Sequence, residues 1–163
     1  GLSYTVERSD FAPWHPGRCA ELLVDGKAVA HAGELHPRVC SEFGLPARSC
    51  ALVINLDALP ASTTVRAAVI GSMPIAVQDV ALVVAADVSA AALEQALVDG
   101  AGDLLESIVL FDRYDKIGDG KISLAFTLSF RAPDRTLTGE EITAARESAV
   151  ANAAKLYGAT VRS

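Results

Sequence analysis

The chain has 163 residues, of which 51% are hydrophobic and 21% charged, a composition that supports a packed core and argues against disorder. Its formal net charge of -6 argues against a general polyanion binder, because affinity for phosphates comes largely from clustered Lys and Arg. Three cysteines are too few and too widely spaced for a disulfide framework or a zinc knuckle, so we expect a reduced, cytoplasmic protein. No run of residues is long and apolar enough to span a membrane.

The first segment, residues 1–62, has the pattern strand–strand–helix–strand. The predicted strands are residues 20–24, 27–35 and 49–57, and the predicted helix is residues 37–44. Asp25-Gly26 favours a type I′ turn between the first two strands, because Gly accepts a positive φ at little cost. A unit of this size buries its own faces poorly, and the chain starts at Gly1 rather than Met. We therefore expect the tail of a larger sheet, cut from a longer protein.

The second segment, residues 63–163, is predicted to follow the order β-α-β-β-α-β, the ferredoxin-like split unit of the α+β class. The predicted strands are residues 79–86, 103–114, 121–131 and 159–162. Ser89 can cap the first helix, which Gly100 and Gly102 are expected to end. Thr138 and Glu141 form a capping box at the start of the second helix. We expect an antiparallel sheet with both helices on one face.

The strand at residues 121–131 alternates between two kinds of side chain. One set is apolar: Ile122, Leu124, Phe126, Leu128 and Phe130. The other set is small, and mostly polar: Ser123, Ala125, Thr127 and Ser129. This period of two predicts a sheet that is covered on one face only. The buried stripe of the last helix is predicted to be Ile142, Ala145, Ala149, Ala153 and Leu156. A bare sheet face can bind single-stranded RNA, or it can pack on a neighbouring domain.

Two further motifs are open to a metal or catalytic interpretation. Residues 115–122 resemble part of a calcium-binding loop, but Ile117 and Phe126 stand where two key oxygen ligands are needed. The alternative is a β-hairpin connection that turns at Gly118 and Gly120. The three histidines have no carboxylate or thiol at a ligand spacing, so structural roles are favoured over catalysis. A free-standing enzyme is a hypothesis that rests on these features alone.

Two ordered sets of motifs resemble one protein family. The first set is Trp14-His15-Pro16-Gly17-Arg18 with Gly33-Glu34-Leu35-His36-Pro37. The second set is Asp79-Val80-Ala81, Leu110-Phe111-Asp112-Arg113-Tyr114, Gly120-Lys121-Ile122-Ser123-Leu124-Ala125-Phe126 and Asp134-Arg135-Thr136-Leu137-Thr138-Gly139-Glu140-Glu141. Together they are similar to the C-terminal end of the bacterial phenylalanine–tRNA ligase beta subunit. The first segment resembles the end of its inactive synthetase-like module, and the second resembles its ferredoxin-fold anticodon-binding domain.

The resemblance implies part of an aminoacyl-tRNA synthetase that joins phenylalanine to its tRNA with ATP and Mg²⁺. It implies two alpha and two beta subunits, with the aminoacylation site in the alpha subunit. We therefore expect no catalytic residue, metal or cofactor in this chain itself. The implied partners are phenylalanine tRNA and the alpha subunit, with neither DNA nor a membrane. The alternative is a structural module that docks other subunits or domains of the synthetase.

The resemblance also implies RNA contacts at Asp112, Ser123 and Arg162. Asp112 can accept a hydrogen bond from a base N–H, Ser123 can donate or accept, and Arg162 can stack on a base or neutralise a phosphate. The alternative for Asp112 and Ser123 is that they only tie the hairpin together. Gln78 stands where the family usually has Arg, so one positive charge expected near the RNA is missing.

Overall fold

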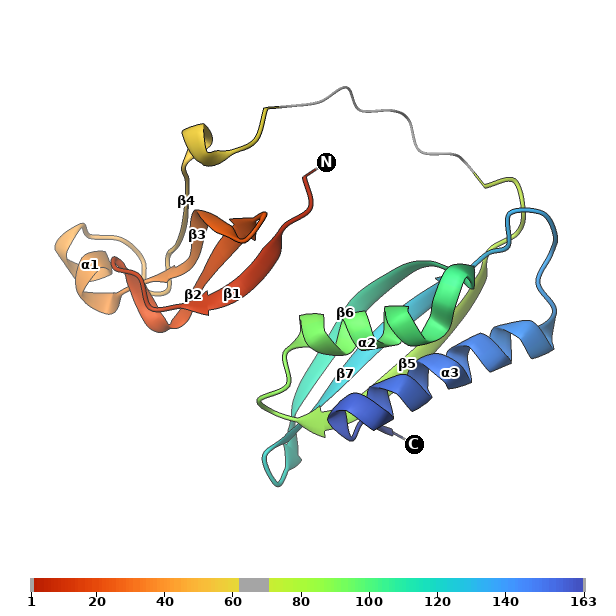
Figure 1. Ribbon diagram of the computed structural model, residues 1–163. Helices are drawn as coiled ribbons and strands as arrows, with labels where there is room; N and C mark the ends of the chain where they lie inside the picture. The colour runs from red at the N-terminus through yellow and green to blue at the C-terminus, as the bar shows by residue number, and fades with distance from the viewer. Residues whose placement is uncertain (1, 62–70, 163) are drawn as a thin grey trace. The chain divides into compact units, whose positions relative to one another are not determined.

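The computed structural model describes residues 2–61 and 71–162, which divide between two compact units, Gly1–Ala68 and Val69–Ser163. Each unit has its own four-stranded sheet and its own hydrophobic core. Figure 1 draws the strands and helices of both units. The predicted boundary between residues 62 and 63 lies outside the described residues.

The first unit is an antiparallel sheet of order β1-β2-β3-β4. Its elements are β1 (Thr5–Ser9), β2 (Trp14–Val24), β3 (Lys27–Leu35), α1 (Pro37–Glu42) and β4 (Cys50–Ile54). The type I′ turn is confirmed, since Asp25 and Gly26 have φ of 50° and 74°. The predicted order was wrong in lacking β1. That strand exposes nearly all of its side chains, so it has no buried alternation to reveal it, and pairing with β2 defines it.

The third predicted strand of this unit was too long at its C-terminal end. β4 ends at Ile54, and a 3₁₀ turn, η1 (Leu56–Ala58), follows it. The Asn55 side chain accepts a hydrogen bond from the Asp57 backbone N–H at 3.1 Å. Asn is suited to this role because its short side chain reaches backbone donors two residues ahead. The chain therefore leaves the sheet earlier than its apolar residues predict.

Gly33 holds β2 and β3 close together. A Cβ on this residue would lie 2.1 Å from the Arg18 carbonyl oxygen and 2.8 Å from the Cys19 Cα. The pairing of β2 with β3 is irregular between Trp14 and Cys19, next to this contact. Only a residue without a side chain fits this approach, which explains the glycine at position 33 in the first motif set. The buried core of this unit is small, with Val24, Val29 and Ala30 at its centre.

The second unit confirms the predicted β-α-β-β-α-β order. Its elements are β5 (Ala76–Ala85), α2 (Ala90–Ala101), η2 (Gly102–Leu104), β6 (Leu105–Gly118), β7 (Lys121–Phe130), α3 (Gly139–Tyr157) and β8 (Thr160–Val161). The sheet is antiparallel, in the order β6-β7-β5-β8. Both α2 and α3 cover the same face of it (Figure 1).

The predicted apolar side chains of β7 form the centre of this unit's core. They pack with the alternate residues of β5 and with small residues of the helices. The fully or almost fully buried members of the two strands are Val80, Leu82, Val84, Ile122, Leu124, Phe126, Leu128 and Phe130. Each face of a strand repeats every second residue, so the other alternate set must point away from the helices.

The helix ends follow the sequence signals. Ser89 accepts a hydrogen bond from the Ala92 N–H at 3.1 Å. Thr138 and Glu141 form the reciprocal capping box, at 3.2 and 2.9 Å. Gly158 ends α3 in the left-handed conformation, with φ of 62°.

Three details of the second unit differ from prediction. Leu156 was assigned to the buried stripe of the last helix, but it is 54% exposed. Gly100 does not end its helix. It lies inside α2, where a Cβ would come within 2.8 Å of the Ala149 Cα on α3, so it allows close helix packing. The strand predicted at residues 103–114 begins later, at Leu105, because a 3₁₀ turn occupies residues 102–104. It also runs further than predicted, to Gly118.

Candidate nucleic-acid interface

The face of the second sheet opposite α2 and α3 holds the three RNA-contact residues predicted from the sequence. We call it the open face. Cross-strand pairs of β5, β7 and β6 place its side chains in four rows: Val77, Ser129 and Ser107; Asp79, Thr127 and Val109; Ala81, Ala125 and Asp112; Val83, Ser123 and Tyr114. Within residues 71–162 of the second unit, both helices lie on the other side of the sheet, and no further layer of this unit covers the open face (Figure 1).

A bulge in β6 places Asp112 on the open face. Leu110 pairs with Phe126, which points toward the helices, whereas Asp112 pairs with Ala125, which points away from them. In a regular strand Leu110 and Asp112 would share a face, so the extra residue, Phe111, reverses the direction of Asp112. The Asp112 side chain is exposed, as an RNA contact requires.

Arg162 reaches across the open face. Its backbone N–H donates to the Ala81 carbonyl at 2.9 Å, which continues the pairing of β8 with β5. Its Cζ lies 4.9 Å from the centre of the Tyr114 ring, a cation–π contact. Since β8 and β6 are the opposite edges of the sheet, the two side chains must extend over the strands between them. They form a bridge, Arg162–Tyr114, above the middle of the face.

Ser123 is not open to solvent, contrary to the prediction that it lies on a bare surface. It is only 3% exposed. Ser123 pairs directly with Tyr114, so the Arg162–Tyr114 bridge accounts for its cover. Thr127 and Ser129 of the same strand remain partly exposed. Along β7 the buried part of this face is therefore limited to Ser123 and Ala125, next to two long side chains that a ligand can displace more easily than a packed layer.

The charges on the open face balance. Asp79 and Asp112 carry negative charge, while Lys121 and Arg162 carry positive charge. The Thr127 hydroxyl donates to the Asp79 carboxylate at 2.7 Å, which uses part of the hydrogen-bonding capacity of Asp79. A neutral face with exposed donors and acceptors can read the polar edges of bases, but it attracts phosphates weakly.

Sequence reasoning did not identify Tyr114 as a site residue. It is 40% exposed, contacts Arg162 and faces the same side of β6 as Asp112. The sequence contained a signal for Tyr114, because it lies two residues after Asp112 and residues two apart on a strand share a face. An exposed aromatic ring on that face can stack on an unpaired base.

The metal and catalytic interpretations gain no support. Asp119 and Gly120 have φ of 52° and 66°, so they form a tight turn between β6 and β7 and confirm the predicted hairpin. The His15 and His36 rings each accept a hydrogen bond from the backbone N–H two residues ahead, at 3.0 and 3.2 Å. Across residues 2–61 and 71–162, no cluster of three or more His, Cys, Asp or Glu side chains is arranged to hold a metal ion.

Within residues 2–61 and 71–162, none of the helices has both the length and the apolar character needed to cross a membrane.

Comparison with protein families assigns both units. Residues 71–162 match the model of the ferredoxin-fold anticodon binding domain. Residues 1–56 match the model of the phenylalanyl tRNA synthetase beta chain CLM domain. The family models therefore agree with the motif sets found in each segment.

Curated relatives carry the name phenylalanine–tRNA ligase beta subunit. The chain is 55% identical to that of Cutibacterium acnes over 156 residues, covering 93% of this chain and 19% of the relative. It is 53% identical to that of Nocardia farcinica over 154 residues, covering 93% and 18%. It is 53% identical to that of Streptomyces avermitilis over 171 residues, covering 100% and 20%. The chain thus spans about a fifth of the length of these relatives. It belongs to the phenylalanine–tRNA ligase beta subunit family, and its second unit is a ferredoxin-fold anticodon-binding domain.

Proposed function

We propose that the open face binds the anticodon of phenylalanine tRNA. The observation that carries the proposal is the meeting of Asp112, Ser123, Tyr114 and Arg162 on one face of the second sheet, which the helices of the described part of this unit leave uncovered. The name of the matching domain family supports this ligand class. The four residues supply a carboxylate acceptor, a hydroxyl, an aromatic ring and a guanidinium, which together suit an unpaired base.

Each side chain has a distinct role in this proposal. The Asp112 carboxylate accepts hydrogen bonds from base N–H groups, and the Tyr114 ring stacks on a base plane. Arg162 leaves the Tyr114 ring when RNA binds and then contacts a base or a phosphate. That movement uncovers the Ser123 hydroxyl, which becomes a donor or acceptor. In this proposal the Arg162–Tyr114 bridge keeps Ser123 covered until an aromatic base replaces the guanidinium.

The rest of the proposal concerns the longer protein. Residues 1–62 form the end of a synthetase-like module, and residues 63–163 form the anticodon-binding domain. The full enzyme is a cytoplasmic ligase that joins phenylalanine to its tRNA with ATP and Mg²⁺, in a heterotetramer of two alpha and two beta subunits. This chain contributes tRNA contact and no catalytic group. The names of the relatives support the assignment.

A titration of the ¹⁵N-labelled chain with the anticodon stem-loop of phenylalanine tRNA at low salt tests the proposal. We expect shifts in the backbone amide signals of Asp112, Ser123, Tyr114 and Arg162. Asp112→Asn should weaken binding roughly tenfold or more, because hydrogen bonds to charged groups are worth about 1.5–3 kcal/mol. Asp99→Asn is the matched control, since Asp99 lies on α2 on the other side of the sheet. Unchanged signals at the open face at saturating RNA would contradict the proposal.

A second candidate function is docking of other subunits or domains. The observation in its favour is the exposed apolar surface of the first unit, where Phe43 is 74% exposed and Leu56 is 73% exposed. Large exposed apolar side chains in one small unit are typical of protein contact sites. Co-expression with the alpha subunit tests it: the complex should form with the parent chain and weaken in Phe43→Ser or Leu56→Ser variants.

A further inference from the structure

A hollow in the first unit lies where the end of β3, α1 and the loop before β4 meet. Its volume is about 300 Å³. This is at the small end of ligand pockets, so it suits one side chain or a small molecule. The lining residues are Arg18, Glu34, Leu35, Pro37, Cys40, Ser41, Leu45, Ala47 and Arg48. Neither the proposed RNA contact nor any matched family name uses this site.

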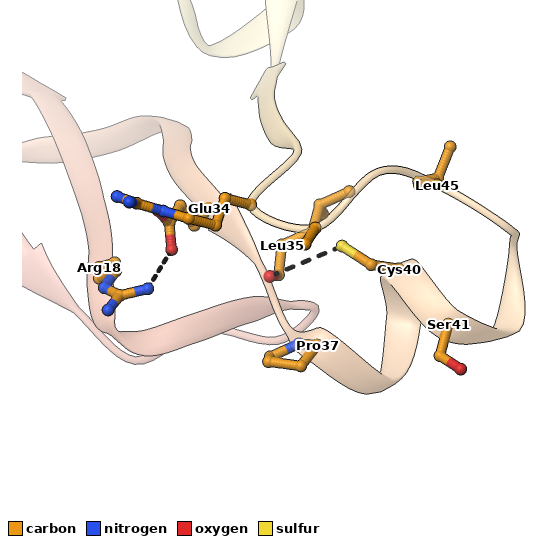
Figure 2. Close-up of a pocket in the computed structure, with 9 residues that line it drawn as sticks. Arg18, Glu34, Leu35, Pro37, Cys40, Ser41 and Leu45 are labelled. Carbon is orange, nitrogen blue, oxygen red and sulfur yellow. Dashed lines mark hydrogen bonds and ion pairs between the residues drawn. The ribbon is translucent and has the colours of Figure 1, made fainter.

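The hollow has a charged end and an apolar end. Figure 2 shows Arg18 and Glu34 on one side, Pro37, Cys40 and Leu45 on the other, and Leu35 between them. A ligand that fills it must therefore carry a polar group and an apolar group close together.

The charged end keeps a surplus of positive charge. The Glu34 side chain is 11% exposed, and its two oxygens are used by Arg18 Nη1 and by Arg48 Nε, the latter at 2.7 Å. The guanidinium of Arg48, followed by that of Arg18, holds the pKa of the Glu34 carboxyl below its usual range, so Glu34 stays ionised. Two guanidiniums against one carboxylate leave a net charge of +1 on the lining residues.

The two arginines still have donors to offer. Their side chains are 53% and 76% exposed, and each guanidinium has five N–H bonds in a planar fork. The Glu34 contacts use only one nitrogen on each, so the remaining N–H groups can meet a second carboxylate.

We propose that this hollow binds a carboxylate attached next to an apolar group, of the kind found at the C-terminal residue of a peptide. The carboxylate meets the free N–H groups of Arg18 and Arg48, and the apolar group contacts Leu35, Cys40 and Leu45. A free amino acid fits less well, because its ammonium would lie beside two guanidiniums. Hence the ligand is an apolar carboxylate without a neighbouring positive charge.

Three small probes test the proposal on the ¹⁵N-labelled chain. N-acetyl-leucine should shift the amide signals of Leu35, Cys40, Ser41 and Leu45 in a saturable way. N-acetyl-leucinamide, which lacks the carboxylate, should bind about tenfold more weakly or worse, as expected for the loss of a charge-assisted contact. Free leucine should also bind more weakly than N-acetyl-leucine. Equal binding of the acid and the amide would overturn the proposal.

Arg48→Gln gives an independent test, with Arg38→Gln as its matched control. Arg48 lines the hollow, whereas Arg38 is an exposed residue of α1 that does not line it. We expect Arg48→Gln to reduce affinity for N-acetyl-leucine about tenfold, with Arg38→Gln near the parent value. Equal loss in the two variants would show only a general charge effect and would overturn the site, as would full affinity in Arg48→Gln.

Discussion

Replacing Tyr114 tests whether an aromatic ring on the open face holds an unpaired base. Tyr114 is 40% exposed, and the Cζ atom of Arg162 lies 4.9 Å from the centre of its ring. Base–aromatic stacking contributes about 1–3 kcal/mol per base, so Tyr114→Ala should weaken binding of the anticodon stem-loop by roughly 5- to 150-fold. Tyr114→Phe keeps the ring and should bind nearly as well as the parent chain.

The same substitution has a small, separable effect on stability. Tyr114→Ala loses an exposed cation–π contact, worth about 0.5–1 kcal/mol, and no buried core contact of the second unit. The variant should therefore fold, and thermal unfolding followed by circular dichroism checks this. Binding is measured by fluorescence anisotropy of a labelled stem-loop at one fixed low salt concentration. A folded Tyr114→Ala variant with the parent affinity would refute the stacking role.

The other predictions concern salt, packing and pH. The logarithm of RNA affinity should fall with the logarithm of salt concentration with a slope of only about -0.7 to -1.4, because single-strand binding loses roughly 0.7 per neutralised phosphate and the open face has few cations. Gly33→Ala should destabilise the first unit by about 1–3 kcal/mol or more in denaturant unfolding, since the added Cβ would overlap the β2 backbone. Thr138→Ala should cost about 1 kcal/mol through loss of the helix cap. The Thr138 N–H, followed by Arg135, lowers the pKa of Glu141 in the folded chain from its usual 4.5. This stabilisation should be present above pH 4.5 and lost as pH falls through the lowered pKa, which unfolding measured across acidic pH values checks.

Local patterns in the sequence predicted most of the second unit. The apolar side chains of β7, the cap at Thr138 and the stop at Gly158 are predicted from residues close together in the chain, and all three agree with the structure. The prediction failed where burial depends on distant partners. Leu156 continues the helical stripe, yet it lies in the last turn of α3 and stays exposed. The periodicity of a helix does not reveal where the sheet beneath it ends.

In the candidate site, too, the sequence did not predict the features that depend on partners distant in the chain. The family resemblance pointed to Asp112, Ser123 and Arg162, and the structure brings them to one face. The bulge that turns Asp112 toward this face has no local sequence signal, since it appears only in the pairing of β6 with β7. Ser123 is only 3% exposed, and its partner on β6, Tyr114, contacts Arg162 from the opposite edge of the sheet, so alternation along β7 alone could not predict the burial of Ser123.

The balance of charge on the open face determines what kind of RNA binder this unit can be. Asp79 and Asp112 offset Lys121 and Arg162, and the whole chain carries a formal charge of -6. In the proposed complex, phosphates are therefore attracted weakly, base edges meet hydrogen-bond acceptors, and the face of a base stacks on the Tyr114 ring. Binding of this kind depends on base identity more than on strand length or salt. A change of an anticodon base should then weaken binding more than a change of stem sequence at equal charge, and equal effects would point to contact with the RNA backbone instead.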